Sequence, residues 1–453
     1  MVTQEQMAVT SNNLANVNNP SYAEEQLQVE TAIPLETQAG EEGTGVDPGS
    51  ITELRNSLLD GQIQSENSVT GSLTAQQSAL QNTQAYLDEE ISSTSSSATP
   101  DSPNGLTDDM ANMFAAFTGL EADPTSTSLQ QVAVASAQQV SNQFTSVSSQ
   151  LATLNGDLNT SVQNDTTSAN QYLTSIASLN GQIVQAQASG GTSVTLVDQR
   201  EQDLESLSNL TNFSTSTQSN GAVDVSIGGV TMVSGQTNTD SLEAYDPGNG
   251  QLQIKAQNAG TPLTLTGGSI AGEINVRDGA MASLQSGLNT LASQMITQVN
   301  SIYSTGYDAS GNTGQNFFSG TDATDIGVNP SLVSDPSQFQ TSGTAGDGDN
   351  TIVVAMAALG NQSISGLGNQ TFSANYADTV ANLGIAVSSV NQNLSDSQAV
   401  SQSLTSERAS AGGVSLDAEM TNLLQYQKAY EASAELITSV DEMLQTLIAM
   451  PTT

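Results

Sequence analysis

Residues 414–453 carry the most regular apolar pattern in the chain. Apolar side chains recur there every three or four residues, which places them on one face of a helix. They are Leu423, Tyr426, Tyr430, Ile437, Val440, Leu444 and Leu447. Ser415 stands before the pattern as a candidate N-cap, and Pro451 follows as a stop signal. The spacing predicts an amphipathic helix over residues 416–450.

A helix of this length extends about 50 Å, which is too long for one small domain to cover its apolar face. An ordinary core helix is one interpretation, and a coiled-coil contact with a partner is the one we favour. A short helix is also predicted at the start of the chain, ending before Pro20. Leu14 and Val17 lie at heptad-compatible positions in it. We call these two residues and the seven listed above the assembly seam.

Between the two ends, the period of the apolar pattern changes twice. Helical spacing occurs over 50–90, 110–117, 132–158 and 172–183, gives way to period two over 220–265, and returns over 284–302 and 379–408. Ser92 to Pro103 is rich in serine and predicts a loop. The fold class predicted is mainly α, with an inserted antiparallel β domain in an elongated multidomain chain.

This pattern also suggests domain boundaries. We expect a terminal coiled-coil domain from residues 1–22 plus 414–453 and a helical domain from 50–210 plus 270–410. The β domain then occupies residues 211–269. Both parts of the helical domain would flank this insertion in the sequence.

Charge narrows the range of partners. The chain has 46 acidic and 6 basic residues, a formal net charge of −40, which disfavours nucleic acid and anionic membrane surfaces as partners. It contains no run of about 18 apolar residues that could span a bilayer, and no basic-then-apolar start typical of a cleaved signal peptide. We therefore expect no membrane insertion.

Candidate chemistry is sparse. The absence of histidine and cysteine removes the commonest general bases, thiol nucleophiles and zinc ligands. Acidic glycine loops begin at Asp308 and Asp347, but their twelfth positions are Ser319 and Ala358, so neither is an EF-hand loop. We predict no catalytic residue, cofactor or metal site, and hence no enzyme. A hydrolase that uses two carboxylates stays open as an alternative.

The two ends resemble a known family. Residues 11–22 read SNNLANVNNPSY and are similar to the S-N-N-x-A-N-x-N-T-P-G-Y signature of flagellar axial proteins. The matching positions are Asn12, Asn13, Ala15, Asn16, Asn18, Pro20 and Tyr22. Residues 416–434 and 441–444 resemble the C-terminal signature of the same proteins. Interior stretches narrow the resemblance to the family of hook-associated protein 1: residues 114–124, 197–201, 277–278, 288–300, 306–318 and 348–350.

The resemblance implies a structural adaptor of the bacterial flagellum, located outside the cell at the hook-filament junction. It implies that copies form a ring-like layer through their terminal helices and contact the hook protein and a second junction protein. An export chaperone and a type III route without a cleaved signal follow from the same resemblance. Family members usually have a longer helix before the signature, so we expect further coding sequence upstream. The alternatives are a hook or distal rod protein, or a secreted Ser/Thr-rich adhesin.

Overall fold

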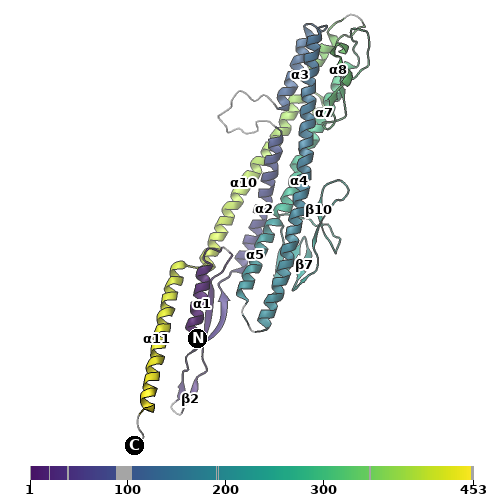
Figure 1. Ribbon diagram of the computed structural model, residues 1–453. Helices are drawn as coiled ribbons and strands as arrows, with labels where there is room; N and C mark the ends of the chain where they lie inside the picture. Colours follow the sequence, from purple (N-terminus) through teal and green to yellow (C-terminus); the bar gives the residue numbers. More distant parts are fainter. Residues whose placement is uncertain are drawn as a thin grey trace.

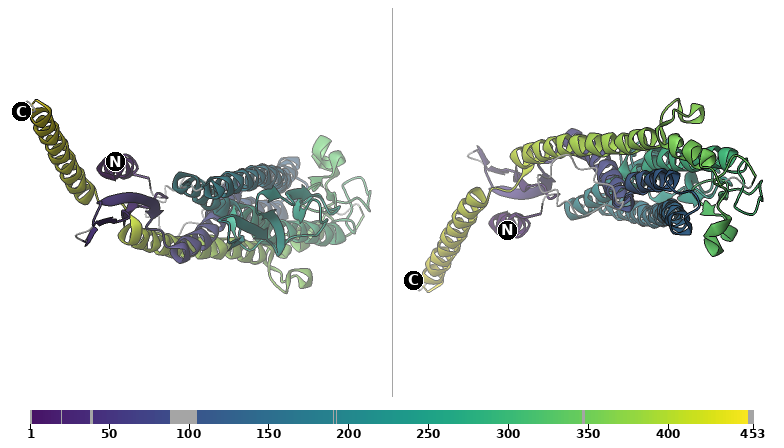
Figure 2. Two further views of the ribbon diagram at one scale, coloured as in Figure 1. Left: turned by 90° about the horizontal axis from the view of Figure 1, so that it is seen from below. Right: turned by 90° about the horizontal axis from the view of Figure 1, so that it is seen from above.

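The computed structural model describes residues 2–19, 21–37, 40–87, 105–189, 191, 193–345 and 348–449. The molecule is a long, narrow rod of helices, and both chain ends lie at the same end of it (Figure 1). Seen along the rod, the last helix projects away from the body (Figure 2). The loop predicted over Ser92 to Pro103 and the stop at Pro451 lie outside the described residues.

Long helices account for most of the rod. They are α1 (Val2–Ala15), α2 (Ser57–Tyr86), α3 (Leu106–Glu121), α4 (Thr127–Ala188), α5 (Val194–Leu210), α6 (Gly268–Val276), α7 (Ala282–Tyr303), α10 (Phe372–Gly412) and α11 (Leu416–Ile448). Two short helices, α8 (Pro330–Ser334) and α9 (Thr351–Ala358), lie between α7 and α10 in the sequence. A π-helical turn, Arg277–Met281, joins α6 to α7. None of the described helices combines the length and apolar character needed to cross a membrane.

Helix α4 runs through most of the rod as one unbroken helix of 62 residues, about 90 Å long. The sequence pattern predicted two helices here, over 132–158 and 172–183, and that division was wrong. Val162, Thr166 and Ala169 continue the buried stripe across the supposed break. Packing of this face against the rest of the fold outweighs the weak helix propensity of the polar and β-branched residues around it.

The strands predicted over 220–265 correspond to two small antiparallel sheets against α4 and α5, which span residues 214–256; the strand predicted at Leu263 and Leu265 was wrong. One sheet has the order β5-β6-β7-β8, and the other pairs β9 with β10. Their bounds are β5 (Ser214–Thr217), β6 (Val223–Ile227), β7 (Val230–Ser234), β8 (Thr237–Asn238), β9 (Leu242–Tyr245) and β10 (Gln253–Ala256). Gly228 and Gly229, both at positive φ, make the tight turn between β6 and β7. Val225 and Ile227 share one core with Leu173 of α4 and Leu204 of α5.

A second set of strands was not predicted from the sequence. The strands β1 (Glu25–Thr31) and β4 (Val46–Glu53) pair antiparallel, and between them β2 (Leu35–Thr37) pairs with β3 (Gly40–Glu42). The helical spacing assigned to residues 50–90 was therefore wrong for 50–53, which belong to β4. This ribbon connects α1 to α2 and extends alongside the end of the rod (Figure 1).

The far end of the rod is held by a cluster of aromatic side chains. Phe317 is fully buried, and its ring centroid lies 4.9–5.7 Å from those of four other aromatic residues: Phe117, Tyr303, Phe318 and Phe339. These residues come from α3, α7 and the segments after α7, including the short hairpin of β11 (Phe318–Ser319) and β12 (Gly327–Val328). The cluster therefore joins chain segments that are far apart in the sequence.

The predicted fold class is confirmed: the chain is elongated and mainly helical, with small antiparallel sheets and a long C-terminal helix. The domain boundaries stay a prediction.

Replacing Phe317 by alanine removes the centre of the aromatic cluster. We expect a loss of about 3–5 kcal/mol in the free energy of unfolding of the helical rod. Val333→Ala is the control, because Val333 lies on α8 in the same region with 42% of its surface exposed. Urea unfolding followed by circular dichroism would contradict the packing described here if the two variants had the same midpoint.

Candidate assembly site at the joined chain ends

The two ends of the chain meet through α1 and α11. The side-chain amide of Gln4 donates to the Tyr430 hydroxyl over 3.4 Å, near the start of α1. Toward the end of α1, Asn13 and Glu419 line a common pocket. The two helices therefore run antiparallel, and α1 lies beside only the first half of α11 (Figure 1).

The assembly seam is partly covered in the single chain. Leu14, Val17, Leu423 and Tyr426 are half-buried. The later seam residues of α11 are more exposed: 43% at Tyr430, 67% at Ile437, 41% at Val440, 52% at Leu444 and 69% at Leu447. Every described residue from position 427 onward is exposed. The structure thus brings the first part of the seam together and leaves the second part uncovered.

The opening helix ends earlier than predicted. It stops at Ala15 rather than just before Pro20, so Val17 lies in the following turn. The side-chain amide of Asn16 donates to the Asn12 carbonyl, and the Asn16 N–H lies within hydrogen-bond distance of the carbonyls of both Asn12 and Asn13. Such local side-chain bonds compete with the next helical turn.

Asn13 joins α1 to the first strand. Its side-chain amide donates to the Glu25 carbonyl over 2.9 Å, and its Oδ1 accepts from the Glu25 N–H over 3.0 Å. The same Oδ1 accepts from the Tyr22 hydroxyl over 2.8 Å. Asn13 is 1% exposed. It therefore satisfies buried backbone groups at the start of β1 that would otherwise lack a partner.

Other signature residues support this contact. The Asn12 amide donates to the Glu25 carboxylate over 3.0 Å, and burial together with the nearby carboxylates of Glu25, Asp198 and Glu53 raises the pKa of Tyr22 far above its usual value. Ala15 and Asn18 are exposed, and Pro20 lies outside the described residues. Sequence reasoning identified the signature but missed this role, because the partners of Asn13 are mostly backbone groups.

A buried ionic cluster joins the terminal region to the rod. Arg55 contacts Glu53 at 3.0 Å, Asp60 at 3.4 Å and Asp198. Arg408 contacts Asp60 at 3.7 Å and Glu205. These six side chains, which we call the junction cluster, come from β4, the segment after it, α2, α5 and α10, and each is at most 18% exposed.

Backbone contacts reinforce the junction cluster. The Arg55 guanidinium also donates to the Ser21 carbonyl over 3.1 Å, and the Ser21 hydroxyl donates to Glu205 over 3.1 Å. The Glu24 N–H donates to the Gly412 carbonyl over 2.8 Å. A Cβ atom at Gly412 would lie 1.9 Å from the Leu54 carbonyl oxygen, so this close approach requires glycine. The chain thus enters and leaves the rod at one tightly packed point.

The junction cluster contains more acid than base. Burial, then the neighbouring Asp198 carboxylate, raises the pKa of Glu53 to about 7, although Arg55 opposes the shift. Burial likewise raises the pKa of Asp198 to about 6 against the effect of Arg55. Glu53 and Asp198 therefore hold protons more tightly than the same two residues in an unfolded chain.

Two further arginines lie inside the molecule. Arg200 is 5% exposed and donates to the Asn180 side chain over 3.2 Å and to the Gly221 carbonyl over 2.8 Å. Arg277 is fully buried and bonds to Asn159 over 2.7 Å. Both side chains connect helices or sheet to α4, which gives them a structural role.

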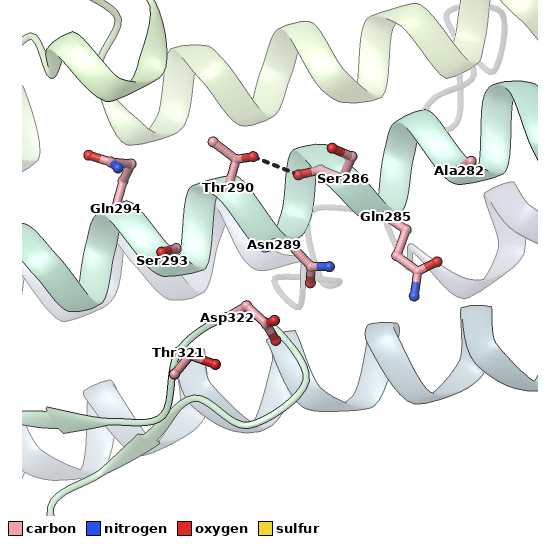
Figure 3. Close-up of a pocket in the computed structure, with 9 residues that line it drawn as sticks. All are labelled: Ala282, Gln285, Ser286, Asn289, Thr290, Ser293, Gln294, Thr321 and Asp322. Atoms are coloured by element: carbon pink, nitrogen blue, oxygen red, sulfur yellow. Dashed lines mark hydrogen bonds between the residues drawn. The ribbon is translucent and has the colours of Figure 1, made fainter. Parts of the chain in front are cut away.

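Another hollow lies beside α7, away from the chain ends. It is an open groove of about 560 Å³ lined mainly by amide and hydroxyl side chains. Figure 3 shows Gln285 and Asn289 on the side of α7 that faces the loop of Thr321 and Asp322. The one carboxylate, Asp322, already accepts from the Thr324 N–H and hydroxyl. Among the described residues, no group of three or more metal-ligating side chains is placed to hold an ion.

Comparison with known proteins agrees with this architecture. The chain matches the family described as flagellar hook-associated protein FlgK helical domain over residues 92–318. Residues 407–450 match the family described as flagellar basal body rod FlgEFG protein C-terminal. The second match covers α11 and the end of α10.

Full-length relatives extend the similarity to nearly the whole chain. Flagellar hook-associated protein 1 of Bacillus subtilis is 25% identical, over 98% of this chain and 95% of its own. The protein of the same name from Salmonella typhimurium is 21% identical, over 98% and 97%. The structure of the flagellar hook junction protein FlgK from Burkholderia pseudomallei has a similar fold, with a TM-score of 0.63, 17% identity, and coverage of 77% of this chain and 100% of that one.

The chain ends of this helical rod lie together, and its C-terminal helix matches a family of flagellar rod proteins. These two features place the chain in the class of flagellar axial proteins. The chain belongs to the FlgK family of flagellar hook-associated proteins. It is a structural component of the flagellum and not an enzyme, as the sequence analysis predicted.

Asn13→Ala tests the contact between α1 and β1. The variant leaves the Glu25 N–H and carbonyl without the Asn13 side chain and removes one hydrogen bond of the Tyr22 hydroxyl, which we expect to cost about 2–4 kcal/mol in local stability. Hydrogen exchange over residues 22–31 should become faster. Asn18→Ala is the control, because Asn18 is an exposed member of the same signature. Equal exchange in the two variants would show that Asn13 does not hold the strand.

Glu53 should make the junction cluster sensitive to pH. Its pKa is raised from 4.5 to about 7, so its stabilising contribution is full below about pH 4.5 and is lost as the pH rises through 7. We expect hydrogen exchange around residues 53–60 to be slower at pH 5.5 than at pH 8, after correction for the intrinsic rate. Glu53→Gln should flatten this dependence. An unchanged pH profile in that variant would mean that another group titrates.

Proposed function

We propose that this protein is an adaptor that joins the flagellar hook to the filament by self-assembly of its chain ends. The observation that carries the proposal is the uncovered half of α11, where the seam residues Ile437, Leu444 and Leu447 are 52–69% exposed. Large apolar side chains on an isolated helix face gain stability only when a neighbouring chain covers them. Relatives named hook-associated protein and hook junction protein support the location.

The fold suggests which contacts the chain ends and the rod would make in the assembled junction. Copies would form a ring-like layer in which the chain ends make the inner contacts and the rod makes the outer ones. The hook protein would lie on one side of the layer, and a second junction protein toward the filament on the other. Before assembly, an export chaperone would cover the C-terminal helix, and the subunit would leave the cell by the flagellar type III route.

A hook or distal rod protein is the second candidate. The match of residues 407–450 to a rod-protein family keeps this candidate open. That C-terminal helix is common to several axial proteins, so the match alone does not separate them. The match over residues 92–318 is to the helical domain of hook-associated proteins, and it favours the junction. A secreted adhesin has less support, since the sheets β5 to β10 are small and share their core with α4 and α5.

A double substitution tests the seam. Ile437 and Leu444 lie seven residues apart on one face of α11, so Ile437→Asp with Leu444→Asp would place two carboxylates in the proposed contact. We expect the variant to keep its folded rod and to be exported, yet to fail to join hook to filament. Filament protein should then appear in the culture fluid, and swimming should be lost.

Ser439→Asp with Thr446→Asp is the matched control. These residues have the same spacing on the opposite side of α11, so the added charge is equal but the seam is intact. Export must be verified first, by detection of each variant outside the cell. Normal motility of the exported seam variant would refute the proposal.

A further inference from the structure

A small acidic pocket lies where α1, β1 and α11 meet. Its volume is about 180 Å³. Thr10 and Asn13 of α1, Glu25 of β1, and Glu419 and Tyr426 of α11 contribute to its wall. The pocket therefore lies in the region through which the proposed assembly takes place.

Two carboxylates in this wall are incompletely satisfied. Glu419 is 3% exposed and Glu25 is 4% exposed. Oε2 of Glu419 and Oε1 of Glu25 are buried and have no hydrogen-bond partner among the described residues. Burying a carboxylate oxygen without a donor is costly, so the pocket favours a cation supplied from outside.

An ammonium group suits this pocket better than a metal ion. Calcium takes six to eight oxygen ligands, and magnesium requires a nearly octahedral set. The described residues offer no group of three or more acidic side chains placed to ligate a metal. A lysine side chain has three N–H donors on a flexible stem, enough to serve both unpaired oxygens.

The chain's own basic residues identify the source of the cation. All six lie in the part of the chain that the structure describes, and the four arginines are at most 15% exposed. Lys255 pairs with Glu243 at 3.3 Å and lies over the ring of Tyr245. Lys428 on α11 is 77% exposed. It is the basic side chain that projects most freely into solvent.

Lys428 cannot fill the pocket of its own chain. It follows Glu419 by nine residues, which is about two and a half helical turns, so the two side chains leave α11 on opposite faces. Glu419 faces α1 and β1, while Lys428 faces outward. A second copy can therefore supply the lysine.

We propose that Lys428 of one copy enters the Glu25–Glu419 pocket of an adjacent copy and joins the chain ends head to tail. This inference rests on the proposed function and names one contact within it. A pocket on one face and a cation on the other make a heterologous interface, which forms a ring if its rotation closes and a helical array if it does not. The lysine also offsets part of the electrostatic repulsion between adjacent copies, each of which has a net charge of −40.

Little is lost when Lys428 moves. Its present partner is Glu431, three residues later on the same helix, at 2.7 Å, with both side chains more than 60% exposed. Exposed pairs of this kind contribute little stability. A hydrogen bond from an ammonium group to a carboxylate is shorter and about twice as strong as one between neutral groups.

Charge reversal on assembled flagella tests the contact. On isolated hook-basal bodies that carry this protein, a carbodiimide, which joins an amine to a carboxylate in direct contact, should give crosslinked dimers. Lys428→Glu and Glu419→Lys should each lower the dimer yield about tenfold or more, and the combined variant should restore the yield. Glu419→Gln keeps the side-chain volume and should also lower the yield. Lys255→Glu is the control, because its pair with Glu243 lies in the sheets beside α4.

The outcomes separate the contact from the proposed function. If the Lys428→Glu protein enters the junction and gives dimers at the wild-type yield, the pocket contact is wrong and the adaptor function still holds. If wild-type protein is absent from hook-basal bodies, the proposed function itself fails. If each single variant folds to the same helical content but the combined variant gives no dimer, the pairing of Lys428 with Glu419 is refuted.

Discussion

The fold depends on a single crowded point where the chain enters and leaves the rod. Arg55 and Arg408 approach from segments at opposite ends of the sequence and share the carboxylate of Asp60. Gly412 allows the end of α10 to touch the strand end at Leu54. Because removing one partner from a buried ion pair leaves the other uncompensated, loss of any one of these side chains should destabilise this arrangement of ribbon and helices.

Away from that point, stability comes from apolar packing along α4. The first half of this helix shares a core with α2, α3, α7 and α10, and its second half shares another with α5 and the sheets. One helix therefore links two hydrophobic cores that would otherwise be independent. The described part of the terminal region has no comparable core, since the buried residues of α1 are Val9, Thr10 and Asn13. Its order relies on hydrogen bonds and, in our proposal, on neighbouring copies.

The sequence predicted the elements that carry a clear apolar period. The expected N-cap of α11 at Ser415 is confirmed: the Ser415 hydroxyl accepts a hydrogen bond from the Ala418 N–H. The ribbon of β1 to β4 was missed because most of its residues are exposed, with Ile33 88% and Leu35 61% exposed, so it shows no regular alternation of buried and exposed positions. The resemblance to axial proteins marked the important polar residues without revealing what they do.

The site was predictable only in part, for a physical reason. Apolar seam residues follow a helical repeat that is visible in the sequence. The partners of Arg55 and Glu419 are set by tertiary contacts between distant segments, and no local pattern encodes them. The one signal in the sequence was the small number of basic residues. With only six of them, each lysine and arginine could be considered individually as a partner for the many carboxylates.

Because both ends leave the rod at the same end, the opposite end is free of the chain's outward connections (Figure 1). Segments there, such as those around α8 and α9, can lengthen, shorten or acquire an inserted domain while α1, α11 and the junction cluster keep their positions. The architecture therefore keeps the joined chain ends apart from an end of the rod that can change in length or content.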